Sequence, residues 1–299
     1  NTMWVGTEKG LNKYDYETKT FIKYYDEDSG GVLSNSYITN IKEVKDEYIV
    51  IGSKCGASVV DMKQNIVYKS SFDSNEYDYI YNREVDKNGD IWFATKNGIH
   101  KYDYESNTLN AFTIDIDKEI YSDINSILCD ESNNLWFASS NGIIKYNEEG
   151  KCEWAKAIGG TGNDYINVVT TTKVEGCIIG GIFYSDSIDL ENKLTLTDNG
   201  SGDGFIIKYN SDGEIEWAKV IGGKKRDGIY SITETRDDGY ILGGYYESES
   251  INLGNEINLS NKEFNTSYGM LIKYNKEGEI EWAKENTIDT SIKSIIEVN

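Results

Sequence analysis

A short phrase recurs along this chain and constrains its fold more than any other feature. In the first copy, Trp4-Val5-Gly6-Thr7 leads through a turn glycine to Lys13-Tyr14-Asp15. The phrase returns at residues 92–103 and 136–147, and its two later tryptophans, Trp92 and Trp136, lie 44 residues apart. Short strand-like runs repeated at this interval are typical of a protein built from one small antiparallel sheet per repeat.

Each repeat divides into four strand-like runs, which we call strands A to D. Strand B carries the tryptophan phrase, and strand C carries the glycine and the Lys-Tyr pair. Residues 37–41 are typical of strand A, and residues 20–24 are typical of strand D. Alternating polar and apolar residues, with Asn-Gly and Asp-Gly turns between the runs, favour antiparallel strands. We therefore predict an all-β fold of the β-propeller type, in which each repeat is one blade.

The number of strand B runs predicts six blades, with seven as the alternative. They begin at Trp4, Val50, Trp92, Trp136, Ile178 and Ile241. The chain opens on a strand B, and it closes on residues 291–298, which resemble the strand A at residues 228–234. Joining the two ends would complete the first blade and remove two exposed sheet edges. Residues 1–299 are therefore predicted to form a single propeller domain.

The two halves of the chain differ in blade length. The blades are compact up to about residue 150, after which a second phrase recurs around Trp154, Trp217 and Trp282. Extra residues enter the last two blades between strands B and C, at 185–203 and 247–267. Strand direction alternates, so both insertions should lie on the face that also carries the D–A connections. Such loops can bind a ligand, or they can be decorative products of duplication.

The first half resembles the two-component regulator propeller repeat, through residues 33–41, 88–95 and 133–139. The second half resembles bacterial β-propeller repeats of the SBBP type, through residues 202–209 and 213–219. The first family supplies sensor ectodomains to bacterial histidine kinases and to some diguanylate cyclases. The second occurs in bacterial surface and secreted proteins. These resemblances imply an extracellular or cell-surface module of a larger bacterial signalling or surface protein.

The charge of the chain excludes several classes of partner. The chain has 30 basic and 51 acidic residues, a net charge of −21. This charge repels phosphate backbones, so we expect no nucleic acid partner. Anionic membranes are disfavoured for the same reason, and the chain has no apolar run long enough to cross a bilayer.

We expect no cofactor and no resident metal. The four cysteines, Cys55, Cys129, Cys152 and Cys177, lack the spacing of a zinc site. A Cys129–Cys177 or a Cys152–Cys177 bridge is compatible with the sequence. The Asp-rich turns at residues 86–90 and 198–203 are the nearest approach to Ca²⁺ loops, but neither matches the calcium-binding pattern. Ordinary turn chemistry explains them better than Ca²⁺ binding, which is the alternative.

The sequence favours a protein without catalytic activity. Its single histidine, His100, lies in a predicted strand C, away from the expected axis. Propeller lyases of similar repeat type generally use histidine chemistry, and no other nucleophile motif appears. Catalysis by paired carboxylates, as in a polysaccharide lyase or hydrolase, is the competing interpretation.

The beginning of strand A supplies the candidate binding residues, because in a propeller these positions line the axial funnel. Tyrosine can stack on the apolar face of a sugar, and asparagine can both donate and accept hydrogen bonds. The alternative is that the tyrosines only fill gaps between inner strands. The candidate ligand-binding residues are Tyr37, Tyr79, Tyr81, Asn125, Tyr165, Asn167, Tyr230 and Lys293.

Together these observations predict a non-enzymatic ligand-binding or sensor module, monomeric as a domain, for a small polar or glycan ligand. An adhesive or scaffolding module that binds a protein or glycan partner is the alternative.

Overall fold

Every regular element in the described part of the chain is a β-strand. The computed structural model describes residues 3–26, 33, 36–44, 48–53, 56–61, 66–71, 80–96, 98–103, 106, 108–112, 123–173, 176–191, 193–261, 266–289, 291, 292 and 295. The chain divides into two compact units, the first formed by residues 1–115 and 122–129, and the second by residues 116–121 and 130–299. Each unit is described by itself.

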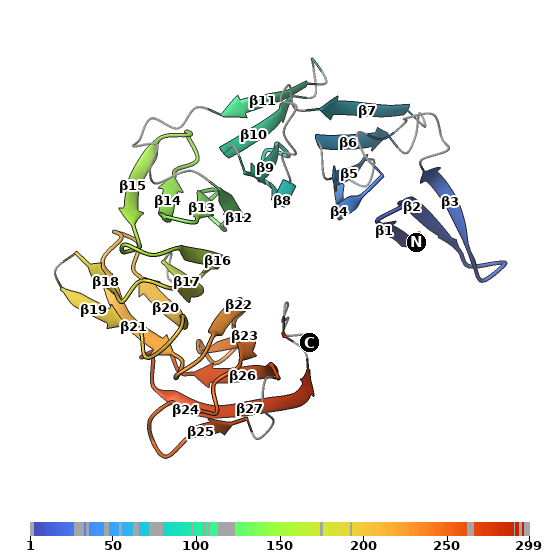
Figure 1. The fold of residues 1–299 in the computed structure, drawn as a ribbon. Helices are drawn as coiled ribbons and strands as arrows, with labels where there is room; N and C mark the ends of the chain where they lie inside the picture. Colours follow the sequence, from blue (N-terminus) through green and yellow to red (C-terminus); the bar gives the residue numbers. More distant parts are fainter. Residues whose placement is uncertain are drawn as a thin grey trace. The chain divides into compact units, whose positions relative to one another are not determined.

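The first unit contains three antiparallel sheets in which the strands follow one another in chain order (Figure 1). The first sheet has the three strands β1 (Met3–Thr7), β2 (Gly10–Asp15) and β3 (Thr20–Asp26). The second consists of β4 (Ile38–Val44), β5 (Tyr48–Ser53), β6 (Gly56–Asp61) and β7 (Ile66–Ser71). The third consists of β8 (Ile80–Val85), β9 (Ile91–Thr95), β10 (Gly98–Asp103) and β11 (Thr108–Phe112).

A fourth sheet continues the pattern with β12 (Ile124–Cys129), β13 (Leu135–Ser139), β14 (Gly142–Tyr146) and β15 (Cys152–Ala157). The fifth is β16 (Asp164–Thr171), β17 (Cys177–Phe183), β20 (Asp203–Tyr209) and β21 (Ile215–Ile221). The sixth is β22 (Asp227–Glu234), β23 (Tyr240–Tyr246), β26 (Tyr268–Tyr274) and β27 (Ile280–Asp289). In each four-stranded sheet the strands correspond in order to A, B, C and D.

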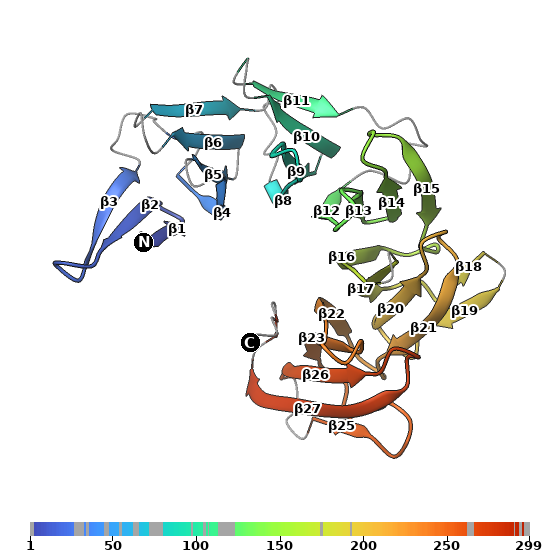
Figure 2. The same cartoon turned by 180° about the vertical axis from the view of Figure 1, so that it is seen from behind.

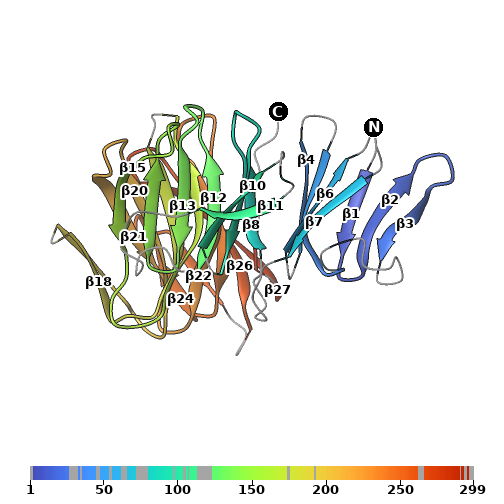
Figure 3. The same ribbon diagram turned by 90° about the horizontal axis from the view of Figure 1, so that it is seen from above.

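The fifth and sixth sheets each carry a two-stranded hairpin between their strands B and C. These hairpins are β18 (Ser187–Leu190) with β19 (Leu194–Thr197), and β24 (Ser250–Asn252) with β25 (Asn258–Ser260). Each lies against the outer strand of its own sheet, as Figure 2 shows for β18, β19 and β21. Seen from the side, β18 and β24 lie at the same end of these sheets (Figure 3). The hairpins fall within the segments 185–203 and 247–267, where the extra residues were expected.

The tryptophans of strand B are fixed by an aspartate in the preceding turn. The Trp136 indole is fully buried and donates a hydrogen bond of 2.9 Å to Asp130 Oδ2. Trp92 donates in the same way to Asp86 Oδ2, at 3.0 Å. The other oxygen of each aspartate accepts backbone N–H groups of its own turn. The repeated tryptophan therefore serves packing, because its indole is buried and its N–H is already satisfied.

The tryptophans of strand D join consecutive sheets of the second unit. Trp154 in β15 donates to the carbonyl of Ser211, and its ring covers Gly213, where an added Cβ would lie 2.8 Å from the indole. Trp217 contacts Gly278 in the same way, at 2.7 Å. Both glycines adopt a positive φ, +75° and +77°. The middle copy of the Gly-x-x-x-Trp phrase thus receives Trp154 on Gly213 and supplies Trp217 to Gly278.

The lysine of the Lys-Tyr pair is buried in the second unit, where it forms an ion pair with strand D. Lys145 Nζ lies 2.7 Å from Glu153 and Lys208 Nζ lies 3.0 Å from Glu216, although both lysines are nearly inaccessible to solvent. Lys145 also lies over the Trp136 ring, 5.2 Å from its centroid. A buried ammonium is tolerated because it is paired and its aliphatic stem packs on an aromatic ring.

The C-terminal residues repeat the packing of an inner strand. Ile292 N–H donates to the carbonyl of Gly244, and an added Cβ at Gly243 would lie 2.7 Å from both Ile292 and Ile295. In the preceding repeat, Ile229 and Ile232 pack in the same way on Gly180 of β17. Ile292 and Ile295 therefore lie on the sixth sheet where the first strand of a following sheet would lie.

Replacing Asp130 by alanine should destabilise the protein by about 1–3 kcal/mol, because the buried Trp136 N–H loses its acceptor. Urea denaturation followed by tryptophan fluorescence measures the change. Glu148→Ala in an exposed turn is the control, and should leave stability within about 0.5 kcal/mol of wild type. Equal stabilities for the two variants would contradict the assigned role of Asp130.

Candidate functional site

A β-bulge recurs in four inner strands, and in three of them the extra residue is one that the sequence singled out for binding. The pairing of β4, β8, β16 and β22 with the next strand skips one residue in each case. The skipped positions are residue 39, Tyr81, Asn167 and Tyr230. A bulge interrupts the ladder and redirects the extra side chain, and bulges are common beside functional sites. The bulge thus distinguishes these positions from their buried neighbours.

The predicted binding residues fall into two groups, one in each unit. Tyr37 and Tyr81 in the first unit are 38% and 45% exposed, and Asn125 is half-buried. Tyr165, Asn167 and Tyr230 belong to the second unit, where Tyr165 is 39% exposed. Tyr79 and Lys293 lie outside the described residues.

Asn167 has a structural role that the sequence analysis did not anticipate. Its side-chain amide donates a hydrogen bond of 2.9 Å to the carbonyl of Ile229 in the neighbouring inner strand. In the first unit, Asn82 makes a comparable link between strands, to Ser126 Oγ at 3.4 Å. The Asn167 amide therefore connects β16 to β22 through one of its two N–H donors.

Tyr165 and Tyr230 belong to an aromatic cluster around Arg226. Tyr165 meets Tyr184 edge to face, with ring centroids 6.4 Å apart, and Tyr230 stacks on Tyr245 at 5.5 Å. Arg226 donates two hydrogen bonds to Tyr184 Oη, at 2.7 and 3.1 Å, and lies over that ring. The hydrogen bonds that Arg226 donates to Tyr184 Oη raise the pKa of Arg226, which favours its charged form.

Sequence reasoning missed Tyr184, Tyr245 and Arg226. Tyr184 and Tyr245 lie at the ends of strands B, and Arg226 lies in a D–A connection. These residues could have been found by examining the ends of strands B and the D–A connection, which lie near the beginning of strand A.

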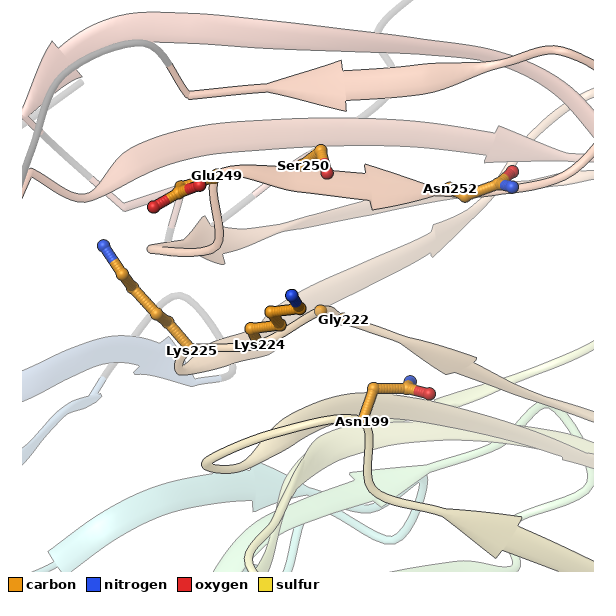
Figure 4. Close-up of a pocket in the computed structure, with 8 residues that line it drawn as sticks. Asn199, Gly222, Lys224, Lys225, Glu249, Ser250 and Asn252 are labelled. Carbon is orange, nitrogen blue, oxygen red and sulfur yellow. The ribbon is translucent and has the colours of Figure 1, made fainter.

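A pocket of about 580 Å³ lies beside this cluster, between the two insertions of the second unit (Figure 4). Its floor is the D–A connection between β21 and β22, and its walls come from the end of the first insertion and from β24. Its lining residues are Asn199, Gly222, Gly223, Lys224, Lys225, Glu249, Ser250 and Asn252. None of the sequence-predicted site residues that the structure describes lines it.

A buried aspartate fixes the floor of the pocket. Asp227 Oδ2 accepts hydrogen bonds from Gly223 N–H at 2.8 Å and from Ser248 Oγ at 2.6 Å. Its Oδ1 accepts the backbone N–H groups of Glu247 and Ser248. One carboxylate thus ties the D–A connection to the start of the second insertion. Burial raises the pKa of Asp227 to about 6, although these hydrogen bonds oppose the shift.

A second buried carboxyl group, Asp203, lies directly against the pocket floor. Its Oδ2 accepts hydrogen bonds from the backbone and side-chain amides of Asn199, at 2.8 and 2.7 Å. Its Oδ1 is buried and has no donor within the described part of the chain. Burial raises the pKa of Asp203 to about 6, and the charges of Asp198 and Asp227 add to the effect.

Asp203→Asn should become more stable relative to wild type as the pH rises from about 5 to about 7.5. In the folded state the carboxyl pKa is raised from 3.8 to about 6, so the stability it contributes is full below pH 3.8 and lost as the pH rises through 6. The asparagine variant lacks this loss.

Urea denaturation at both pH values measures the difference, and Asp212→Asn in an exposed turn is the control. A difference between Asp203→Asn and wild type that does not change with pH would refute the assignment.

Metal and disulfide chemistry find no support among the described residues. That part of the chain holds no group of three or more His, Cys, Asp or Glu side chains that could hold a metal ion. Cys129, Cys152 and Cys177 are free thiols, so neither bridge that the sequence allowed is formed, and Cys55 lies outside the described residues. In the same part of the chain, no helix is present that could cross a membrane.

Comparison with known proteins identifies the fold. No protein-family model and no curated protein matches the chain. Among solved structures, virginiamycin B lyase from Staphylococcus aureus is 14% identical, with a TM-score of 0.55 over 96% of this chain and 92% of that one. A chain of the mitotic checkpoint complex is 11% identical, with a TM-score of 0.61 over 98% and 79%.

An extracellular domain of the putative hybrid two component system BT3049 from B. thetaiotaomicron is 16% identical, with a TM-score of 0.46 over 91% of this chain. The chain spans 41% of that protein and 47% of the corresponding BT4673 domain. At these identities the likeness concerns the fold alone, which is all-β and of the propeller type.

Proposed function

We propose that this protein is a non-enzymatic propeller module that binds a small polar ligand in the pocket of its second unit. The pocket itself carries the proposal: about 580 Å³ enclosed between two insertions and a D–A connection, and lined by amide, hydroxyl and charged side chains. A cavity of this size suits a small molecule. The buried Asp227 network fixes the floor before any ligand arrives, which lowers the entropic cost of binding.

The position of His100 supports a binding role over catalysis. One of the similar structures is a virginiamycin B lyase that is catalytically inactive when a histidine is replaced by alanine. The only histidine of the present chain lies in β10, in the middle of a sheet, where it pairs with Phe93 and Ala111. It belongs to the first unit, whereas the pocket belongs to the second.

The six sheets are the six blades of one ring in this proposal, and residues 291–298 complete the first blade beside β1. The contacts of Ile292 and Ile295 with the sixth sheet support it, because they match those of Ile229 and Ile232 in the preceding repeat. The repeat resemblance in the sequence supports an extracellular place in a larger bacterial signalling or surface protein, with a sensor role. An adhesive role towards a protein or glycan remains the second candidate.

The closure predicts a specific register between the chain ends. In the second sheet, Glu43 of β4 lies opposite Ile49 of β5. Glu297 follows Ile295 at the same interval at which Glu43 follows Ile41. In this proposal the same register pairs Glu297, which lies outside the described residues, with Met3, which precedes Trp4 as Ile49 precedes Val50.

The double variant Met3→Cys with Glu297→Cys should therefore form an intramolecular disulfide on oxidation at low protein concentration. Antiparallel partners bring their Cβ atoms close enough for the bond. Peptide mass spectrometry identifies the link. Met3→Cys with Glu148→Cys is the control, and should not form it. A double variant that links only between molecules would argue against closure.

The binding role predicts that filling the pocket abolishes ligand binding. Ser250→Trp places a large ring in the pocket wall, whereas Ser187→Trp makes the same change at the equivalent exposed position of the first hairpin, which does not line the pocket. A panel of mono- and oligosaccharides, amino acids and organic acids is tested by calorimetry.

We expect any compound that binds to the wild-type protein to lose binding in Ser250→Trp and to keep it in Ser187→Trp. Equal binding by both variants would place the ligand elsewhere. Turnover of a panel compound would replace the binding role with an enzymatic one.

A further inference from the structure

The pocket floor exists in two copies that share one scaffold. Gly160 N–H donates to Asp164 Oδ2 at 2.7 Å, and Ser185 Oγ donates to the same oxygen at 2.6 Å. In the second copy, Gly223 and Ser248 make the same two bonds to Asp227. Each of these residues lies 63 positions after its counterpart. The two D–A connections are therefore held by the same bonds.

The side chains on the two copies differ in charge. The first copy carries Thr161-Gly162-Asn163, and the second carries Lys224-Lys225-Arg226 at the equivalent positions. In a chain of net charge −21, this is the only place where basic residues are adjacent. The pocket lies over the second copy. Three consecutive cations on a loop whose counterpart is neutral indicate a role that the scaffold itself does not require.

The three cations have different positions. Arg226 is engaged by Tyr184 through two hydrogen bonds and ring contact, on the side of the aromatic cluster. Lys224 and Lys225 line the pocket, and Figure 4 shows both side chains rising from the floor towards the strand that bears Glu249 and Ser250. Lys224 is exposed and has no ion-pair partner within the described residues. Its charge is available to a ligand.

Within the described residues, no acidic group around the floor forms an ion pair with Lys224. Asp227 accepts four hydrogen bonds from neutral donors, and none of them comes from a lysine. Among the described residues that line the pocket, Glu249 is the one carboxylate, beside two lysines. Asn199, Ser250 and Asn252 add neutral hydrogen-bonding groups on both sides of the floor. The lining therefore suits a ligand with one anionic group and a polar body.

We propose that the pocket binds a small organic anion, with Lys224 and Lys225 holding its carboxylate, sulfate or phosphate group. Asn199, Ser250 and Asn252 then bind the hydroxyl or amide groups of its body. This inference rests on the proposed function and specifies the ligand class of the same site.

Three matched probes test the charge requirement: glucuronate, glucose 6-phosphate and glucose share one polar body and differ in the anionic group. Calorimetry or ligand-observed NMR at about 50 mM salt should show at least one of the two anions binding about tenfold or more tighter than glucose. Raising the salt concentration to about 500 mM should weaken the binding of the anion. The two charged probes distinguish a carboxylate ligand from a phosphate ligand.

Lys224→Gln and Lys225→Gln should each lower the affinity for the anion about tenfold. Lys219→Gln, at an exposed position of β21, makes the same charge change outside the pocket and should leave the affinity unchanged. Equal affinity for all three probes, or unchanged affinity in both pocket variants, overturns the anion assignment. Ser250→Trp distinguishes the two proposals. If neutral compounds bind to wild type and no longer bind to Ser250→Trp, the pocket is still a ligand site and only its preference for anions is rejected. Inorganic sulfate binding as tightly as the organic anions shows an adventitious ion only, which also overturns it.

Discussion

The fold depends on close packing between the second strand of one sheet and the first strand of the next. At Gly180 and Gly243 a glycine in strand B accepts the branched side chains of two isoleucines, and any added Cβ would lie within 2.9 Å of them. Gly6 makes the same contact with Ile38 in the first unit. The absent side chain allows these three sheets to bury a face closely against an inner strand. The contact therefore joins consecutive repeats at these positions.

The repeated phrase of the sequence encodes this packing and the bonds that reinforce it. Trp136 is fixed by Asp130, and Trp154 covers the turn glycine of the following repeat. The buried Lys145 pairs with Glu153 across strands C and D. Each of these interactions needs a partner at a constant offset in the sequence, so the phrase repeats as a unit. Its members are therefore structural, and a ligand site has to be sought in residues that differ between copies.

The sequence predicted the all-β class and the positions of the strands, because the phrase and its turn glycines mark each hairpin. It also placed the extra residues of the last two blades, where the hairpins β18–β19 and β24–β25 lie. It also selected positions such as Tyr230 at the start of strand A. The structure shows that Tyr230 is the extra residue of a β-bulge, which distinguishes it from its paired neighbours. The register of a bulge depends on two strands together, so no single run of residues reveals it.

The pocket could not be predicted in the same way. Its lining comes from three connections that are distant in sequence, and its floor depends on the bonds of Asp227 to Gly223 and Ser248. The prediction that insertions and D–A connections share a face brings the right segments together but does not choose among their side chains. Asn167 shows that a residue type suited to ligand binding can also join two strands through its amide, a role that the sequence pattern does not reveal.

Duplication explains how a charged site can form on such a scaffold without loss of stability. The bonds that hold each D–A connection come from glycine, serine and aspartate, and they are the same in both copies. The three residues between the second glycine and the aspartate contribute little to these bonds through their side chains. The residues themselves differ, Thr161-Gly162-Asn163 in the first copy and Lys224-Lys225-Arg226 in the second. At Gly162 an added Cβ would lie 2.7 Å from the carbonyl oxygen of Tyr184, so a lysine at that position requires a local shift of the loop. Loops held at both ends by a rigid scaffold are where binding groups are commonly presented. The charge of this loop opposes that of the whole chain, so an anion approaching the acidic surface gains attraction only within the short range of the pocket.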